Sequence, residues 1–105
     1  MVSIYTKRIY YYLSDEGEFE WDEYNLSHIA PHGVTPGEIR EVVEGRHVVP
    51  GPVEINSEDR WILYGKTRAG RYLVVVYTVR NNRIRVVTAH TMHKSQRRKY
   101  AAEID

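Results

Sequence analysis

Three consecutive segments of alternating polar and apolar residues limit the folds open to this chain more than any other feature. They cover residues 60–67, 71–80 and 83–90. A period of two is typical of half-buried strands, and the connections at 68–70 and 81–82 have the length and residue types of hairpins. Because parallel neighbours need a crossover of about a dozen residues or more, we expect an antiparallel meander.

Two segments ahead of the meander carry the signals of short helices. Asp22 is a suitable N-cap for the first, which Pro31 cannot continue. In the second, Thr35 is the N-cap, Glu38 completes a capping box, and Gly45 ends the helix. Both segments are therefore predicted to be helical, joined by a tight turn.

The remaining segments complete a predicted α+β fold with one core, in which N-terminal helices pack on the sheet. Residues 46–59 hold two prolines and a glycine, and are expected to form a loop with at most a short edge strand. Residues 94–104 are predicted to form a C-terminal helix. Residues 1–18 form a separate N-terminal extension, and its abundance of Ile, Tyr and Val favours a strand.

Composition excludes several classes of protein. The chain has no cysteine, which excludes disulfides, thiolate nucleophiles and cysteine-based zinc sites. The longest aliphatic run, residues 73–76, has four residues, whereas a membrane-spanning helix needs about 20. No apolar stretch of a signal peptide follows the basic residues near the N-terminus. A cytoplasmic location without membrane contact is therefore expected.

Charge is divided unevenly along the chain, although the formal net charge is only +1. Residues 1–59 contain 12 acidic and 4 basic residues, a net charge of −8, and residues 60–105 contain 11 basic and 2 acidic residues, a net charge of +9. Such asymmetry suggests a basic surface for a polyanion. The alternative is that the two halves neutralise each other within one fold, since charge patterns bear on partners more than on fold.

Basic and tyrosine residues are interleaved in the second half, as on surfaces that bind single-stranded RNA. In a regular strand over 83–90, Arg83 and Arg85 share one face with Ala89, while Ile84 and Val86 occupy the better core face. The alternative is a solvated sheet face without a ligand. The residues predicted to contact RNA are Arg68, Arg71, Arg83, His93, Lys94, Arg97 and Arg98.

His90 and His93 flank the predicted junction between the last strand and the final helix. Imidazole has an ordinary pKa of ~6.5, so a histidine placed amid positive charge could serve as acid or base in phosphodiester cleavage. Arg85 and His90 are five residues apart, so a regular strand puts them on opposite faces. They can share a site only where a bulge or the strand end reverses the alternation.

Metal and nucleotide cofactors are not expected. His28 and His32 are four residues apart, as two metal ligands on one helix would be, but Pro31 interrupts that helix and no third ligand is evident nearby. Neither a glycine-rich dinucleotide motif nor a P-loop occurs in the sequence.

Several short motifs follow one another in a specific order. They are Phe19-Glu20-Trp21-Asp22-Glu23, Asn25, His32-Gly33-Val34, Glu41-Val42, Arg60-Trp61, Gly65-Lys66-Thr67, residues 71–78, Arg83-Ile84-Arg85, and Ala89 leading to Arg97-Arg98 and Tyr100. This order resembles the BrnT family of bacterial type II toxins over residues 19–103. The resemblance implies a single BrnT-like domain over 19–105 with a RelE-like fold.

The resemblance and the basic second half together favour a ribonuclease that inhibits translation and needs no metal. The ribose 2′-OH would attack the adjacent phosphate and leave a cyclic phosphate and a free 5′-OH. The catalytic candidates are Arg60, Lys66 and Arg85 for stabilising charge on phosphorus, His90 as acid or base, and Tyr100 for positioning the substrate. The family also implies a ribbon-helix-helix antitoxin, which we expect to cover the basic surface. Whether the chain forms a homodimer is left open by the sequence.

His90 departs from the resemblance, because the family commonly has arginine at this position. The change could replace a phosphate-binding cation with a titratable acid or base. It could equally mark a member that has lost nuclease activity. The alternative function is therefore a non-catalytic module of the same fold that binds a protein or a nucleic acid.

Overall fold

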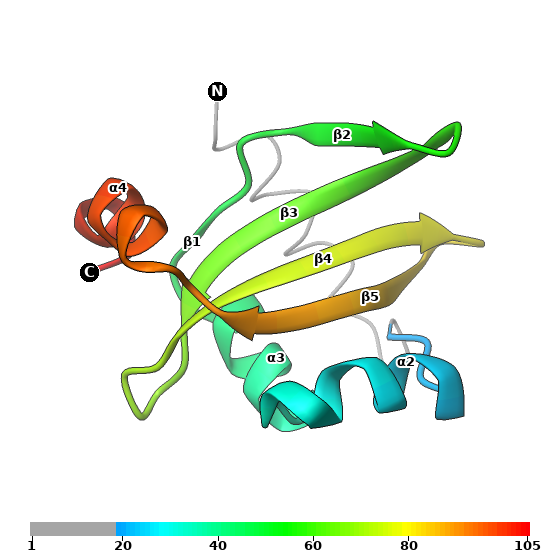
Figure 1. Ribbon diagram of the computed structural model, residues 1–105, viewed down its shortest axis with the longest axis horizontal. Helices are drawn as coiled ribbons and strands as arrows, with labels where there is room; N and C mark the ends of the chain where they lie inside the picture. Colours follow the sequence, from blue (N-terminus) through cyan, green and yellow to red (C-terminus); the bar gives the residue numbers. More distant parts are fainter. Residues whose placement is uncertain (1–18) are drawn as a thin grey trace.

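A five-stranded antiparallel sheet lies at the centre of the computed structural model, which describes residues 19–105 (Figure 1). Its strands are β1 (His47–Val48), β2 (Pro52–Ile55), β3 (Glu58–Lys66), β4 (Tyr72–Arg80) and β5 (Arg83–Thr91), and its helices are α2 (Glu23–Ile29), the 3-10 helix η1 (Ala30–His32), α3 (Pro36–Glu44) and α4 (Lys94–Ile104). The order in the sheet is β1-β3-β4-β5, with β2 also paired to β3. The predicted α+β class and antiparallel meander are confirmed. The predicted N-terminal strand lies outside the described residues.

Two-residue turns form two of the hairpins in the sheet. Asn81 and Asn82 connect β4 to β5, and both have positive φ angles, 51° and 62°, as a type I′ turn requires. A second turn of this kind at Asn56 and Ser57, with φ of 53° and 63°, connects β2 to β3. Residues 46–59 therefore hold β1, β2 and the start of β3, more strand than the single short edge strand expected.

Capping boxes begin both N-terminal helices. The sequence predicts the box at Thr35 and Glu38, whereas for the first helix it predicts only the N-cap Asp22. The Asp22 side chain accepts from the Asn25 backbone N–H at 3.1 Å, and the Asn25 side chain accepts from the Asp22 N–H at 2.8 Å. Thr35 and Glu38 exchange the equivalent bonds at the start of α3, both at 3.1 Å. These caps satisfy N–H groups that a helix start otherwise leaves without partners.

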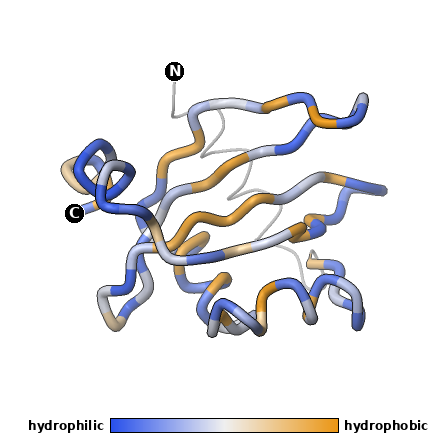
Figure 2. Tube along the Cα trace, viewed as in Figure 1, coloured by the Kyte–Doolittle hydropathy of each residue, from blue (hydrophilic) through white to orange (hydrophobic). Residues whose placement is uncertain are grey.

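The sheet face toward α2 and α3 forms the main core (Figure 2). The helices contribute Ile29, Ile39, Val42 and Val43, and the strands contribute Leu63, Leu73, Val75, Tyr77, Ile84, Val86 and Ala89. Burial of each Val, Leu or Ile among them stabilises the fold by about 1.5–3 kcal/mol. Gly65 marks the closest approach of β3 to α3, because a Cβ there would lie 3.0 Å from the Cβ of Val42.

The opposite sheet face is covered at one end by α4 (Figure 1). The cluster there contains Val48, Val74, Met92 and Ile104, with Tyr64, Tyr72 and Tyr100 against it. The other part of this face carries Arg60, Thr78, Arg80, Arg85, Thr88 and His90, and we call it the open face. No helix within residues 19–105 is long and apolar enough to cross a membrane.

Candidate functional site

A β-bulge in β5 brings Arg85 and His90 to the same face of the sheet. Val76 pairs with Thr88 and Tyr77 pairs with Val86, so Val87 is an extra residue without a partner position on β4. Beyond the bulge the alternation is reversed. Ala89 consequently lies in the core, not beside Arg85 as regular alternation would have it, and His90 joins the open face.

Three arginines from three strands gather at one end of the open face. They surround a hollow of about 430 Å³, the arginine pocket, which is lined by Tyr24, His28, Glu58, Arg60, Thr78, Arg80, Arg85 and Val87. Glu58 pairs with Arg60 at 3.3 Å and with Arg80 at 3.4 Å. Glu58 thus pairs with two of the three guanidinium groups, and the third is paired with carboxylates outside the lining. Guanidinium groups are good ligands of phosphate oxygens.

Arg85 is the most buried of these cations, with 14% of its side chain exposed. It bonds Asp22 at 2.9 Å and Glu20 at 3.3 Å. The Glu20 backbone N–H donates to the Ile84 carbonyl at 2.8 Å, which fixes residues 19–20 along β5 and places both carboxylates beside Arg85. The hydrogen bond from Arg85, followed by that from the Asn25 backbone, lowers the pKa of Asp22. The bond to Asp22 in turn raises the pKa of Arg85.

Three histidines from separate parts of the chain gather beyond the arginine pocket, where β5 ends. The ring centroids of His32 and His90 lie 5.9 Å apart, and those of His90 and His93 lie 6.0 Å apart. With Thr91 they line a hollow of about 420 Å³, the histidine pocket. His28 instead contacts the ring of Tyr24 at 4.5 Å. No group of three or more His, Asp or Glu side chains within residues 19–105 is arranged to hold a metal ion.

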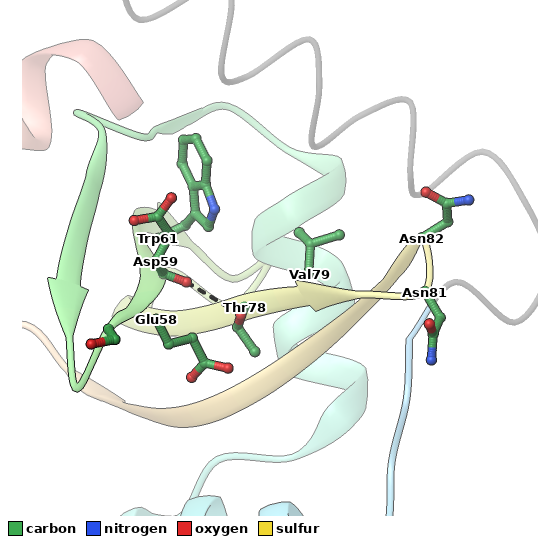
Figure 3. Close-up of a pocket in the computed structure, with 8 residues that line it drawn as sticks. Glu58, Asp59, Trp61, Thr78, Val79, Asn81 and Asn82 are labelled. Atoms are coloured by element: carbon green, nitrogen blue, oxygen red, sulfur yellow. Dashed lines mark hydrogen bonds between the residues drawn. The ribbon is translucent and has the colours of Figure 1, made fainter.

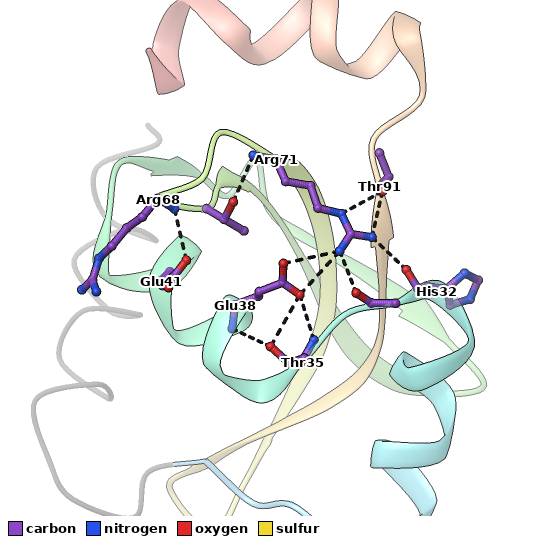
Figure 4. Close-up of polar contacts among 9 residues, drawn as sticks. His32, Thr35, Glu38, Glu41, Arg68, Arg71 and Thr91 are labelled. Atoms are coloured by element: carbon purple, nitrogen blue, oxygen red, sulfur yellow. Dashed lines mark hydrogen bonds and ion pairs between the residues drawn. The ribbon is translucent and has the colours of Figure 1, made fainter.

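Arg71 ties the helical layer to β5 (Figure 4). Its guanidinium donates to the carbonyls of His32 at 2.8 Å and Gly33 at 2.7 Å, to the Thr91 hydroxyl at 3.2 Å, and to Glu38 at 3.4 Å. These internal contacts occupy Arg71, which was expected to bind RNA. Arg68, in the same hairpin, lies toward α3 and is 77% exposed, with Glu44 3.6 Å away.

Lys66 and Tyr100 lie at the α4 end of the sheet, away from Arg60 and Arg85. Lys66 bonds Asp105 at 2.8 Å, and Tyr72 donates to the same carboxylate at 2.7 Å. The bond to Asp105 raises the pKa of Lys66, and the bond from Lys66 is the largest cause that lowers the pKa of Asp105. Tyr100 stacks on Tyr64 with ring centroids 4.1 Å apart. The five catalytic candidates thus share one side of the sheet but form separate groups.

The other predicted RNA-binding residues lie around the open face. Arg83 is exposed at the start of β5 and donates to the Phe19 carbonyl at 2.9 Å. His93 is the N-cap of α4, and Lys94 and Arg98 are exposed on that helix. Arg97 lies over the ring of Tyr72 at 4.3 Å.

A larger hollow of about 690 Å³ lies at the hairpin ends of the sheet (Figure 3). It is lined by Ser57, Glu58, Asp59, Trp61, Thr78, Val79, Asn81 and Asn82. Two carboxylates and no basic residue occur in this lining. Like charge therefore disfavours a phosphate ligand there, in spite of the size of the hollow.

Arg80 and His32 are site residues that the sequence analysis missed. Arg80 follows the alternation of β4 on the same face as Thr78, so counting along the strand would have found it. His32 belongs to a motif of the resemblance, but its closeness to His90 depends on tertiary contacts between residues 58 positions apart, which periodicity does not report.

The comparison with protein families agrees with this geometry. The family described as the ribonuclease toxin BrnT of type II toxin–antitoxin systems matches residues 21–96. The chain belongs to the BrnT family. The resemblance found in the sequence is confirmed. The family implies that the substrate is RNA and that the partner is an antitoxin. No curated protein matches the sequence.

The BrnT match runs from Trp21 to Gln96. The match includes every residue that lines the arginine pocket and the histidine pocket, and it ends within α4. Arg97, Arg98 and Tyr100 lie beyond the matched residues. The arginine and histidine pockets are thus built from the part of the chain that the family match covers.

Proposed function

We propose that this BrnT protein is a metal-independent RNA endonuclease that acts in the cytoplasm and inhibits translation. The observation that carries the proposal is that Arg60, Arg80 and Arg85 lie on the same sheet face as His90. Guanidinium groups bind phosphate oxygens, and an imidazole can transfer the protons that cleavage of RNA requires. This combination needs no metal ion.

In the proposed reaction, the ribose 2′-OH attacks the adjacent phosphorus and displaces the 5′-oxygen. Arg60 and Arg85 lie in a different pocket from His90, so they bind the phosphate of a neighbouring nucleotide and hold the strand in place. His90 moves a proton at the reacting oxygens. Lys66 and Tyr100, at the α4 end, hold a neighbouring part of the RNA.

We propose that the RNA strand runs along β5 from the arginine pocket to the start of α4. Arg85 and His90 are five residues apart, or roughly 16 Å along a strand, so different phosphates of one strand would occupy the two pockets. Arg83, His93, Lys94, Arg97 and Arg98 supply further contacts. Arg68 and Arg71 contribute less than the sequence analysis expected, because one lies toward α3 and the other is bonded internally.

The test is incubation of the purified chain with single-stranded RNA in EDTA, with and without a translating extract. We expect fragments with a cyclic phosphate and a 5′-OH, and a loss of about tenfold in kcat/KM in Arg60→Gln, because one charged contact to a phosphate is removed. Arg40→Gln is the matched control, because Arg40 lies on α3 and pairs with Glu44 at 3.6 Å. Intact RNA in both conditions would count against the proposal.

A second candidate function is a non-catalytic binding module. It is favoured by the pairing of all three candidate cations with carboxylates, since Arg60 bonds Glu58, Lys66 bonds Asp105 and Arg85 bonds Asp22. Induced expression in bacteria separates the two functions. An endonuclease arrests growth unless its antitoxin is present, whereas a binding module is tolerated.

We propose a ribbon-helix-helix protein as the antitoxin, and the basic surface around the open face as its docking site. A basic surface steers an acidic segment toward it. Co-purification with the product of an adjacent reading frame, followed by light scattering, tests the partner and reports whether the free toxin is a homodimer.

A further inference from the structure

The histidine pocket brings together three imidazoles that are distant in the sequence. His32 comes from η1, His90 from β5 and His93 from the start of α4. His90 is the middle ring, 5.9 Å from one neighbour and 6.0 Å from the other. A phosphodiester between two such rings has a different oxygen within hydrogen-bond reach of each, about 2.6–3.2 Å.

The hydrogen bonding of His90 leaves one ring nitrogen ready to accept a proton. Nδ1 lies 2.9 Å from the Thr91 carbonyl oxygen. A carbonyl only accepts, so Nδ1 carries the hydrogen of this bond. In the neutral ring Nε2 is then the unprotonated nitrogen, as a general base requires.

Arg71 fixes the backbone at His32 next to the end of β5. The guanidinium donates to the carbonyls of His32 and Gly33 on one side and to the Thr91 hydroxyl on the other (Figure 4). Gly33 supports this turn, because its φ of +68° is a left-handed conformation that few other residues adopt. The backbone that carries the His32 side chain is therefore held in place beside His90.

We propose that the histidine pocket is the cleavage centre, with His90 as general base, His32 as general acid and His93 as a ligand of the phosphate. This assignment rests on the proposed endonuclease function. His90 Nε2 accepts the proton of the 2′-OH while the bond from the 2′-oxygen to phosphorus forms. The bond from phosphorus to the 5′-oxygen breaks, and protonated His32 donates its proton to that oxygen.

The charged groups around the pocket come from three elements. Arg71 precedes β4, Glu38 from α3 pairs with it at 3.4 Å, and Lys94 follows His93 in α4. Because Glu38 offsets the charge of Arg71, the guanidinium serves as a positioning group. No other group is needed to transfer a proton between the RNA and the pocket.

A substrate with sulfur in place of the 5′-oxygen tests the role of His32, because a thiolate leaves without protonation. We expect His32→Gln to cleave ordinary RNA about 100-fold more slowly and to cleave the sulfur substrate close to the wild-type rate. His90→Gln should be slow on both. The assignment is overturned if His32→Gln matches wild type on ordinary RNA, or if sulfur does not restore its rate while thermal melting shows it folded.

Imidazole NMR signals of the full chain, titrated with inorganic phosphate in EDTA, test the site without any cleavage. The signals of His32, His90 and His93 should shift together with one dissociation constant, while buried His47 serves as the internal reference. A shift of His28 alone places phosphate in the arginine pocket and overturns the inference. If wild type cleaves no RNA, the proposed function fails, and this titration alone decides whether the pocket binds phosphate.

Discussion

Asp22 is both the N-cap of α2 and the partner of Arg85, and one conservative substitution separates these contributions. Asparagine is an equally good N-cap, so Asp22→Asn removes mainly the charge. The folded-state pKa of Asp22 is lowered, so its charge stabilises the fold above the unfolded pKa, near 3.8. This stabilisation is lost as pH falls through the lowered pKa.

We therefore expect Asp22→Asn to be less stable than wild type at pH 7 and equally stable once the pH is well below 3.8. Urea unfolding at a series of pH values measures the difference. In an Arg85→Gln background, Asp22→Asn should lower the free energy of unfolding at pH 7 by less than it does in the wild type. A gap that does not change with pH would mean that the charge of Asp22 contributes nothing.

Arg71 predicts a difference between arginine and lysine that charge alone would not give. Lysine keeps the charge but lacks the planar fork that reaches His32, Gly33 and Thr91 together. Arg71→Lys should cost about 1–3 kcal/mol in the free energy of unfolding and shift the imidazole signal of His32. Arg68→Lys is the matched control in the same hairpin, and its exposed side chain should change stability by less than about 0.5 kcal/mol.

At the scale of elements, Gly65 and Gly37 predict opposite effects of the same substitution. An added Cβ at Gly65 would meet the Cβ of Val42 at 3.0 Å and its carbonyl at 3.2 Å, so Gly65→Ala should destabilise by about 1–3 kcal/mol. At Gly37 in α3 the nearest atom is the Thr35 hydroxyl at 3.8 Å. Gly37→Ala should stabilise by roughly 0.5–1 kcal/mol. Thermal melting of both variants checks the pair, and equal effects would contradict the close packing.

Elements with strong local signals were predictable from the sequence, and those that depend on distant residues were not. Thr35 and Glu38 specify the start of α3 locally, and α4 has the predicted bounds of 94–104. The β2-β3 hairpin was missed because Ser57 adopts a positive φ that Asn or Gly adopts more readily. From the sequence, a bulge could be stated only as the condition under which Arg85 and His90 share a face. No local residue pattern fixes its position at Val87.

The candidate site was only partly predictable for the same reason. The basic second half and the family resemblance placed Arg60 and Arg85 among the candidates, and the structure puts both in one pocket. It leaves Lys66 and Tyr100 at the other end of the sheet. Ion pairs such as Arg71 with Glu38 also join the acidic and basic halves, so part of the charge asymmetry is neutralised internally.

At the scale of the whole molecule, the charge around the open face predicts how binding responds to salt. For single-stranded nucleic acid, the slope of log K against log salt is about −0.7 per neutralised phosphate. Removing two contacts in Arg60→Gln with Arg80→Gln should make the slope less negative by about 1.4. Fluorescence anisotropy with labelled RNA measures it, and Arg40→Gln should keep the wild-type slope. An unchanged slope in the double variant would exclude the arginine pocket from RNA binding.

The antitoxin and RNA should compete for the same surface if the basic residues of α4 and the open face bind both. Saturating antitoxin should then displace labelled RNA completely. Lys94→Glu with Arg98→Glu should weaken both complexes, since like charge then faces each ligand. Loss of RNA binding with unchanged antitoxin affinity would mean that the partner docks on another surface.

The clamp made by Arg71 also ties the appearance of the histidine pocket to tertiary folding. It joins positions that are separated by 38 and 39 residues in the sequence, and the pocket further needs His90 and His93. Contacts between such distant residues form only after the loop between them has closed, which costs entropy. No local segment of the chain can therefore assemble the pocket, and it exists only once the helical layer has docked against β5.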